Sequence, residues 1–562
     1  MAIEATRSIS FQEKQLAFIH EANTLANTVM CPLLSQVLPH EAQVACISLD
    51  MGSSHIKATC TTDDGTIIGN WVLSSSDSFL PGGFVNLQRY ATSAFAVLSS
   101  IAHSGLDFSS LRTIATDGII PSTVVIEGGK TFLDNFGFSY AADKLGTKSA
   151  HYYTSTTGNS NTQKKRGVLP ASASAAEAIR ELINTDFISN KGFKVTDLTD
   201  FVIQFLMDGE GRMPFHVLQY MGLLMHDGAF FDPQVVSSEN TFSVNPPEEY
   251  KIGYADNKIL HLLGFTVQND VEIYNRGLDG LAIQRIMDLA EERDLGKVVA
   301  RAKAETTLAV HTHVQSLTDK PFGGWILRDG PGWKVGIASN DSAGRYKEVT
   351  WNQGYESLPL GDSLPIYRSF FQKRKDETDT QYFTRLDDET NLWIKTHQTE
   401  FAGMVNDAGV WLFGPDRNGN GPSQAKLTKS NYPKDPRAFW YLLKESSALS
   451  MRRMLNQVED YTENPIDALL LLGPLVNSPF WRFLHTTITG RKGFMVTHNG
   501  EVAQEPSLIS LALSALESQG NTRAAQILMD SVGFQEVETS NMEMFKGIDI
   551  NSRYKEYCRE YQ

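Results

Sequence analysis

Five residues with the chemistry to bind phosphate and magnesium lie close together in the stretch ISLDMGSSHIKATC: Asp50, Gly52, Ser53, Ser54 and Lys57. The aspartate ends an apolar run, where a carboxylate is costly unless it has a partner, and hydrated Mg²⁺ is one such partner. The glycine lets a backbone approach a ligand closely, and the N–H and hydroxyl groups of the serines could surround phosphate oxygens. The lysine adds a positive charge. The pattern is short, so a plain hairpin with a polar turn is the alternative.

Other motifs of nucleotide binding and nucleophilic catalysis do not occur in the sequence. It contains no Walker loop of the form G-x-x-x-x-G-K-[ST] and no G-x-G-x-x-G after a predicted strand. It also has no G-x-S-x-G elbow. The sequence therefore gives no support for a P-loop NTPase, a dinucleotide-binding enzyme or an elbow-type serine hydrolase.

The composition is that of an ordinary globular protein, with 562 residues of which 41% are hydrophobic and 20% charged. The net charge of −15 argues against broad binding to nucleic acid or to anionic membranes. No apolar run is long enough to predict a transmembrane helix, and the polar first residues do not form a signal peptide. Four scattered cysteines predict reduced thiols. These features together predict a cytoplasmic protein.

The order of predicted elements indicates an α/β protein. Apolar spacing over residues 10–37 predicts one or two helices before the main fold, which could pack on the protein or on a partner. From Val44 the pattern changes to strands and hairpins that alternate with helices. A second such pattern starts near Gly323, so both halves begin with a strand followed by small residues. This likeness weakly suggests an internal duplication.

Several segments, in this order, resemble the FGGY carbohydrate kinases, which have the actin–hexokinase fold. ISLDMGSSHIKATC resembles their first phosphate motif, and RTIATDGIIPSTVVIEGGKTFLDN their substrate-side segment. TDFVIQFLMDGEGRM and DNKILHLLGF are similar to helices in the middle of the first domain. DPRAFWYLLKESSALSMRRML and LLLLGPLVNSPFWRFLHTTITGRKGFMV resemble the helix, strand and helix of the nucleotide side. The resemblance covers roughly residues 44 to 520.

The resemblance implies two actin/hexokinase-like, ribonuclease H-like domains with a cleft between them. We expect a helical N-terminal extension at 1–43, a first domain at 44–320, a second domain with the nucleotide side at 321–535, and a tail at 536–562. The implied reaction is ATP-dependent phosphorylation of a sugar or polyol hydroxyl, with Mg²⁺ held by Asp50. In this reading Ser53, Ser54 and Lys57 contact phosphates, Gly336 and Ser339 form the opposing phosphate turn, and Gly473 borders the adenosine.

The chain departs from the family pattern at the general base. The family carries an aspartate in a run like Gly-Asp-x-Gln, about twenty residues before the second phosphate turn. With that turn placed at Val335–Ser339, the corresponding residue is His313. An imidazole can accept a hydroxyl proton near neutral pH. Glu305 is a fallback base, and a surface or core histidine is the structural alternative.

Other departures weaken the implied activity. The adenosine strand ends in Gly473-Pro474-Leu475 instead of consecutive glycines, and Pro474 lacks an N–H donor. The alternative function is therefore a catalytically impaired relative that binds a sugar or nucleotide, or regulates a partner. We expect a small-molecule ligand in either case, with a homodimer or protein partner as an option for the N-terminal helices. The identity of the sugar cannot be read from the sequence.

Overall fold

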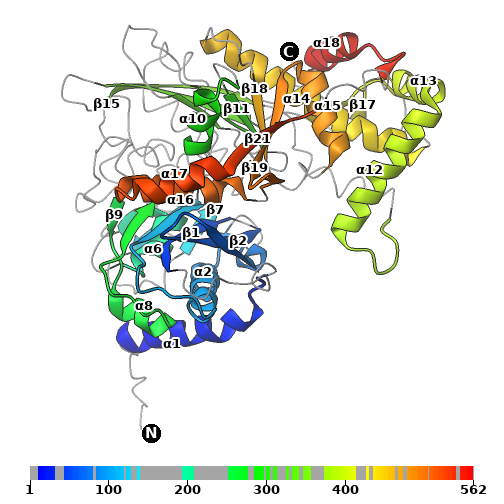
Figure 1. Cartoon of the computed structure of the whole chain (residues 1–562). Helices are drawn as coiled ribbons and strands as arrows, with labels where there is room; N and C mark the ends of the chain where they lie inside the picture. Colours follow the sequence, from blue (N-terminus) through cyan, green and yellow to red (C-terminus); the bar gives the residue numbers. More distant parts are fainter. Residues whose placement is uncertain are drawn as a thin grey trace.

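The chain folds around two large β-sheets, shown in a computed structural model (Figure 1). The structure describes residues 11–31, 43–52, 54–79, 84–118, 122–127, 136–139, 193–207, 251–275, 284–295, 299–303, 308–312, 324–327, 332–340, 346–355, 372–412, 426–429, 435–462, 466, 468–472, 478–503, 505–538 and 545–560. All statements below refer to these residues.

The first sheet has the strand order β3-β2-β1-β5-β10-β9. Strands β1, β5 and β10 are parallel, whereas β2, β3 and β9 pair antiparallel to their neighbours. The alternating and apolar runs of these segments are typical of strands that pack on both faces. Their bounds are Ile67–Ser74 for β3, His55–Thr62 for β2, Val44–Met51 for β1, Thr113–Gly118 for β5, Glu272–Asn275 for β10 and Lys251–Tyr254 for β9.

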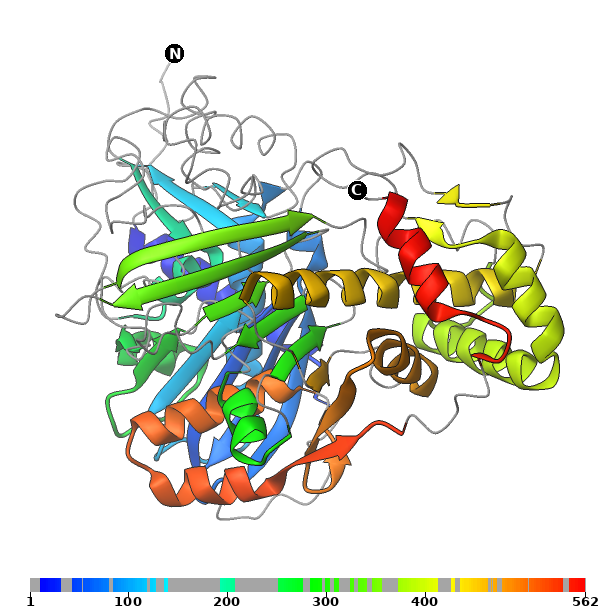
Figure 2. The ribbon, with the colours of Figure 1, turned by 90° about the horizontal axis from the view of Figure 1, so that it is seen from above.

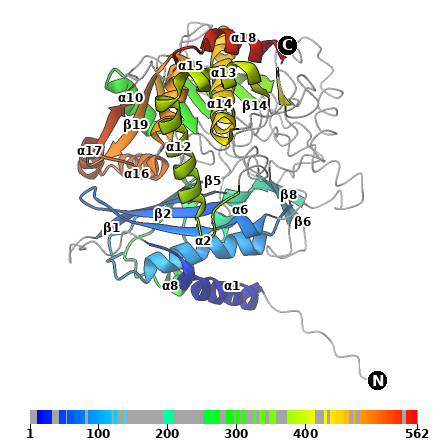
Figure 3. The same cartoon turned by 90° about the vertical axis from the view of Figure 1, so that its right-hand side faces the viewer.

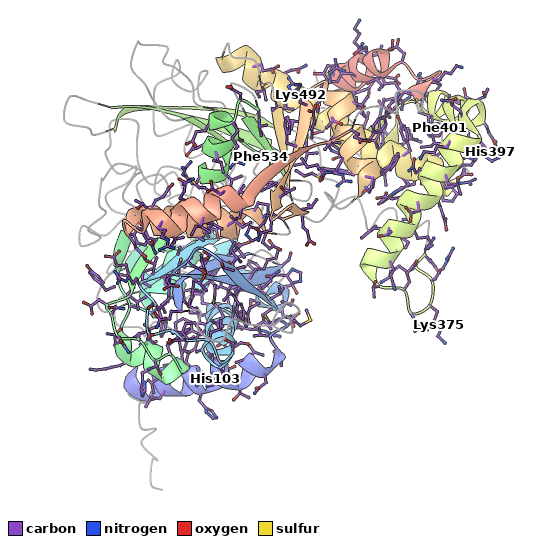
Figure 4. The ribbon with its side chains drawn as sticks, viewed as in Figure 1. His103, Lys375, His397, Phe401, Lys492 and Phe534 are labelled. Atoms are coloured by element: carbon purple, nitrogen blue, oxygen red, sulfur yellow. The ribbon has the colours of Figure 1, made fainter. Side chains whose placement is uncertain are left out.

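Four helices cover one face of the first sheet: α1 (Phe11–Leu25), α2 (Leu87–Ala102), α6 (Leu198–Gln204) and α8 (Asn257–Leu263). The sequence left open where the N-terminal helix packs. In the structure α1 is continued by the short η1 (Ala26–Thr28) and buries Phe18 against rings on α2 and just beyond α6. His103, labelled in Figure 4, ends α2 and contacts the start of the turn after α8.

A small antiparallel sheet with the order β4-β7-β6-β8 accompanies the first sheet. Within it β6 pairs antiparallel with β7, and the residues that join the two strands lie outside the described part of the chain. The strands are β4 (Phe84–Val85), β7 (Phe136–Ser139), β6 (Ser122–Glu127) and β8 (Phe193–Asp197).

The second sheet has the order β15-β14-β13-β12-β11-β18-β19-β20, and β21 pairs with β19 from outside this path. Strands β11, β18 and β19 are parallel, and β12, β13, β14 and β15 follow as antiparallel hairpins. Their bounds are Tyr346–Tyr355 for β15, Gly332–Asn340 for β14, Gly324–Leu327 for β13, Leu308–Thr312 for β12, Val299–Lys303 for β11, Ala468–Leu472 for β18, Lys492–His498 for β19, Glu501–Val502 for β20 and Val532–Glu536 for β21.

The two sheets share one five-stranded pattern. The order β3-β2-β1-β5-β10 in the first sheet has the same strand directions as β13-β12-β11-β18-β19 in the second. Strand β1 thus corresponds to β11, and β2 corresponds to β12. The connection that corresponds to the turn after Asp50 is therefore the one between β11 and β12, residues 304–307.

Helix α16 (Pro506–Ser518) lies between the two sheets, as Figures 1 and 3 show. Its residues Leu508, Leu511 and Ala515 pack on β1 and β5 of the first sheet. Ile509, Ala512, Leu513 and Leu516 instead join the core of the second sheet, together with α10 (Gln284–Glu292) and α17 (Thr522–Ser531). An apolar helix with two buried faces is what a position between two layers requires.

A helical unit extends to one side of the second sheet. It consists of α12 (Asp379–Thr396), α13 (Gln398–Ala408), α14 (Pro436–Thr462), α15 (Pro479–Thr489) and α18 (Ile550–Glu560), with the short strands β16 (Trp411–Leu412) and β17 (Lys426–Leu427). In Figure 2 the long α14 reaches from beside the sheet into this unit. Phe401 of α13, labelled in Figure 4, packs edge-on against Tyr441. The expected C-terminal tail thus includes a helix, α18, that packs on α14.

The expected division between domains at residues 320 and 321 stays a prediction. Strands β11 and β12 precede residue 320, yet both pair in the second sheet. This pairing favours a division before residue 299. No helix within the described residues is long and apolar enough to cross a membrane.

Candidate functional site

Two aspartates lie side by side at the carboxyl ends of β1 and β5. Asp50 and Asp117 are register partners in this parallel pair, so their Cα atoms are neighbours across adjacent strands. Asp117 is 0% exposed, and Asp50 is partly exposed. Ligands of open α/β sheets bind at the carboxyl ends of strands. This edge is therefore the candidate site.

Both carboxylates lie on the face of the first sheet that is turned towards α16. Cys46 of β1 and Ala115 of β5 pack against α16, whereas the intervening Ile47 and Ile114 belong to the core on the opposite face. Because side chains alternate along a strand, Asp50 follows Cys46 and Asp117 follows Ala115 on the same face. The two aspartates thus lie between the first sheet and the elements of the second. The sequence indicated Asp50 but not Asp117, although Asp117 lies in the segment RTIATDGIIPSTVVIEGGKTFLDN that resembles the family's substrate side.

The backbone of the turn after β1 is held by hydrogen bonds. The Gly52 N–H donates to the carbonyl oxygen of His55 at 3.1 Å, and the Gly52 carbonyl accepts from the Ser75 hydroxyl at 2.8 Å and the Tyr90 hydroxyl at 3.2 Å. The Ser54 carbonyl accepts from the Ser75 N–H at 3.0 Å. These bonds fix a tight turn, with Ser54 exposed to solvent. Ser53, predicted to contact phosphate, lies outside the described residues.

Gly52 and Gly118 lie where the neighbouring atoms leave no room for a side chain. A Cβ at Gly52 would lie 2.8 Å from the His55 carbonyl oxygen and 3.9 Å from Asp50 Oδ1. A Cβ at Gly118, the last residue of β5, would lie 2.3 Å from Thr199 Oγ1 and 2.9 Å from the Met51 carbonyl oxygen. Contacts this short exclude side chains, so both glycines are required for the close approach of β1, β5 and α6.

Lys57 lies opposite Asp50 in the antiparallel register of β1 and β2. Its side chain therefore lies on the same face as the two aspartates. Its ammonium bonds Glu505 at the start of α16, with 2.7 Å between Nζ and Oε1. Lys57, which was predicted to contact phosphate, thus lies at the site, but its ammonium is paired with the carboxylate of Glu505.

Gly336 and Ser339 do not form a turn, and the expectation of a small-residue turn there is wrong. Both lie within β14, which pairs with β15 along its length. Gly336 pairs with Trp325, which pairs with His311, and His311 lies beside the first residues of β11. Strand β14 is also four strands from β18, roughly 19 Å at ~4.8 Å per strand. The two residues are therefore at the edge opposite the carboxyl ends of β11 and β18. The misassignment arose because a small-residue run reads equally well as a turn or as a strand.

Gly473 and His313 lie outside the described residues. Gly473 directly follows Leu472, the last residue of β18 and the register partner of Lys303 at the end of β11. His313 directly follows β12, which runs antiparallel to β11. Strand β12 therefore ends at the edge opposite the carboxyl ends of β11 and β18. Both assignments therefore stay predictions.

The strand order draws attention to a different connection and to a further aspartate. Residues 304–307, with the sequence Ala-Glu-Thr-Thr, join β11 to β12 where the first sheet has its turn after Asp50. Asp279 lies 25 residues before Ala304 and four residues after the end of β10, a strand parallel to β1 and β5. Both segments lie outside the described residues. The order of strands in the second sheet identifies residues 304–307, and the parallel pairing of β10 with β5 in the first sheet identifies Asp279; no local pattern contains either signal.

Comparison with solved structures finds proteins of the same fold. A ligand-bound xylulose kinase from Lactobacillus acidophilus matches with a TM-score of 0.65 and 12% identity, over 92% of this chain and 97% of that one. A gluconate kinase from Lactobacillus acidophilus matches with a TM-score of 0.64 and 12% identity, over 92% and 97%. Plasmodium falciparum glycerol kinase with ADP matches with a TM-score of 0.60 and 12% identity, over 92% and 98%.

Comparison of the sequence with family models gave no match, and comparison with curated proteins gave none either. At 12% identity the structural likeness establishes the fold alone. The predicted α/β class and the predicted likeness to carbohydrate-kinase structures are confirmed at that level, and the cleft between domains stays a prediction. The chain thus has the mixed α/β fold of xylulose, gluconate and glycerol kinases over about nine tenths of its length.

Proposed function

We propose that the protein is a kinase that transfers the γ-phosphoryl group of ATP to a hydroxyl of a sugar or polyol. The observation that carries this proposal is the pair Asp50 and Asp117 at the carboxyl ends of β1 and β5, facing the second sheet. Two carboxylates on adjacent strands repel each other unless a cation or a proton lies near them. The fold is that of sugar and polyol kinases, so phosphoryl transfer is the reaction in which such a cation would take part.

The residues present fit a magnesium nucleotide. Carboxylate oxygens are the protein ligands that Mg²⁺ takes alongside water and phosphate oxygens. Asp50 would hold the hydrated ion, Asp117 would supply the second carboxylate, and Ser53 and Ser54 in the turn after β1 would contact a phosphate. When bound, Mg²⁺ would neutralise charge on the transferred phosphoryl group. The chain's own part is to position the phosphates and to keep the turn after β1 rigid through its bonds to Ser75 and Tyr90.

The opposing side of the site belongs to the second sheet. We assign the second phosphate turn to residues 304–307 and the adenosine border to Gly473, because both follow the carboxyl ends of adjacent parallel strands. Hydroxyls of Thr306 and Thr307 could bond phosphate oxygens in the way proposed for the serines after Asp50. Gly336 and Ser339 have no role in this assignment.

We assign the general base to Asp279 in place of His313. Asp279 follows β10, whose carboxyl end lies at the same sheet edge as Asp50 and Asp117. A carboxylate at this edge could accept the proton of the attacking hydroxyl. Phosphoryl transfer depends mainly on positioning and charge neutralisation, so loss of the base should slow the reaction without abolishing ATP binding.

The test is ADP release with a panel of pentuloses, heptuloses, hexonates and polyols, measured for the wild type and for Asp117→Asn. The proposal predicts sugar-dependent ADP release with at least one acceptor and a loss of at least tenfold in kcat/KM for the variant. Absence of turnover on the whole panel, with MgATP bound, would favour a second function. That function is the binding of a sugar or nucleotide without catalysis. The pairing of Lys57 with Glu505 also favours it, because it engages the ammonium that would contact phosphate. A cytoplasmic location belongs to both proposals.

A further inference from the structure

A lysine is fully buried within the helical unit. Lys444 of α14 is 0% exposed, and its ammonium bonds the carboxylate of Asp387 on α12. It also lies over two aromatic rings, 4.9 Å from the centroid of Trp440 and 5.4 Å from that of Phe480. Burial lowers the pKa of Lys444, and the Asp387 carboxylate opposes this shift. A buried ion pair is often no more stabilising than apolar residues of the same volume, so its role need not be stability.

Asp387 joins three elements through its two oxygens. Its Oδ1 accepts from the ammonium of Lys444 and from the indole N–H of Trp440 at 2.7 Å. Its Oδ2 accepts from the hydroxyl of Ser478. Lys444 Nζ itself lies 3.5 Å from the same hydroxyl oxygen. The network therefore connects α12 and α14 to Ser478, which stands immediately before α15.

Ser478 is also the N-cap of α15. Its Oγ accepts from the Trp481 N–H at 3.1 Å, and Pro479 occupies the first turn. An N-cap residue whose hydroxyl is also bonded to a buried carboxylate has little freedom to move. Ser478 follows Leu472, the end of β18, by six positions. The network thus fixes where the chain enters α15 after leaving the carboxyl end of β18.

We propose that Lys444 is a positioning residue that, through Asp387 and Ser478, holds the start of α15 in the place from which it borders the bound nucleotide. The proposal rests on the proposed function, because the carboxyl end of β18 borders the adenosine only if the protein binds ATP. Lys444 does not touch the nucleotide. Its removal should loosen the start of α15 and weaken nucleotide binding while leaving sugar binding unchanged.

The neighbouring residue supplies a matched control. Glu445 is 1% exposed and forms an equally buried ion pair with Arg553 of α18, with two bonds of 2.5 Å. Arg553 further donates to the carbonyl oxygens of Val405 and Gly409. This pair joins α14 to α18 and α13, and the hydrogen bonds of its two side chains within the described residues go to none of α15. Breaking it should lower stability without altering the start of α15.

The experiment compares Lys444→Met with Arg553→Met, and Asp387→Asn with Glu445→Gln, in the full chain. The dissociation constant for MgADP is measured by calorimetry at a temperature where circular dichroism shows each variant folded. We expect Lys444→Met and Asp387→Asn to weaken MgADP binding at least tenfold and to raise the KM for ATP but not for the sugar. The control variants should bind MgADP within twofold of the wild type. If Lys444→Met does not fold, the isosteric Asp387→Asn decides.

Amide hydrogen exchange of the free protein supplies the second readout. Peptides over residues 478–485 should exchange at least tenfold faster in Asp387→Asn and as in the wild type in Glu445→Gln. Folded network variants that bind MgADP within twofold of the wild type would overturn the inference and leave the proposed function standing. A wild type that binds no MgADP would overturn both. Equal loss of binding in the control variants would also overturn the positioning role.

Discussion

Replacing Glu505 by glutamine should tighten the binding of MgATP. Glu505 holds the ammonium of Lys57, which lies opposite Asp50 on the face that carries both site aspartates. If phosphate and Glu505 compete for this ammonium, the neutral amide of glutamine releases it to the nucleotide. Glu505 makes no side-chain hydrogen bond as the N-cap of α16, so the substitution removes no cap.

The size of the effect follows from how exposed the pair is. The side chains of Lys57 and Glu505 are 25% and 21% exposed, so the pair lies between the surface and the interior. Surface pairs contribute ~0–1 kcal/mol, and breaking a buried pair costs ~3–5 kcal/mol. We therefore expect the pair to contribute ~1–2 kcal/mol. Since each ~1.4 kcal/mol is a factor of ten in a binding constant, MgATP should bind about 5- to 30-fold more tightly to Glu505→Gln.

The assay is calorimetric titration of MgATP into the wild type, Glu505→Gln, Lys57→Met and the double variant. Lys57→Met should weaken binding, and Glu505→Gln should have no effect in the Lys57→Met background, because the competition needs the ammonium. The reasoning is refuted if Glu505→Gln weakens binding or leaves it unchanged in the presence of Lys57. In that case Lys57 serves to join the sheet to α16 and not to bind phosphate.

Three further outcomes test other parts of the site and the fold. Asp279→Asn should lower kcat by about 10²- to 10⁴-fold, whereas His313→Gln should change it less than about threefold, as steady-state ADP release will show. Gly118→Ala should destabilise the protein by ~1–3 kcal/mol in urea titrations. The new Cβ would lie 2.3 Å from Thr199 Oγ1, and it could not move away because the Met51 carbonyl oxygen lies 2.9 Å from it. Arg553→Met should cost ~3–5 kcal/mol of stability, since it leaves a buried glutamate without its cation. These expectations would be contradicted if His313→Gln lowered kcat as much as Asp279→Asn does. They would also be contradicted if Gly118→Ala or Arg553→Met left the free energy of unfolding unchanged.

Features that depend on contiguous residues could be predicted from the sequence. The strand that ends at Asp50, its small-residue turn and the following strand with Lys57 all form as expected. Helices α15 and α16 begin at Pro479 and Pro506, and proline in the first turn of a helix is a strong local signal. Local pattern thus located one half of the candidate site.

Features that depend on strand order could not be predicted in this way. The run of small residues around Gly336 predicts a turn opposite Asp50, but strand pairing puts Gly336 at the edge of the second sheet that lies opposite the carboxyl ends of β11 and β18. Asp117 became a site residue only through its parallel register with Asp50. The bond between Lys57 and Glu505 joins residues 448 positions apart. The order of strands and the contacts between elements of the two sheets are set by long-range packing, which cannot be predicted from hydrophobic periodicity or turn residues.

The central claim is that the carboxyl ends of β1 and β5 bind a magnesium nucleotide. The most direct measurement is calorimetric titration of ATP, with and without Mg²⁺, into the wild type, Asp50→Asn and the control Asp63→Asn, whose exposed aspartate lies in the turn at the other end of β2. We predict that the wild type and Asp63→Asn bind ATP at least tenfold more tightly with Mg²⁺ than without it. Asp50→Asn should lose this difference. An unchanged magnesium dependence in Asp50→Asn would contradict the claim.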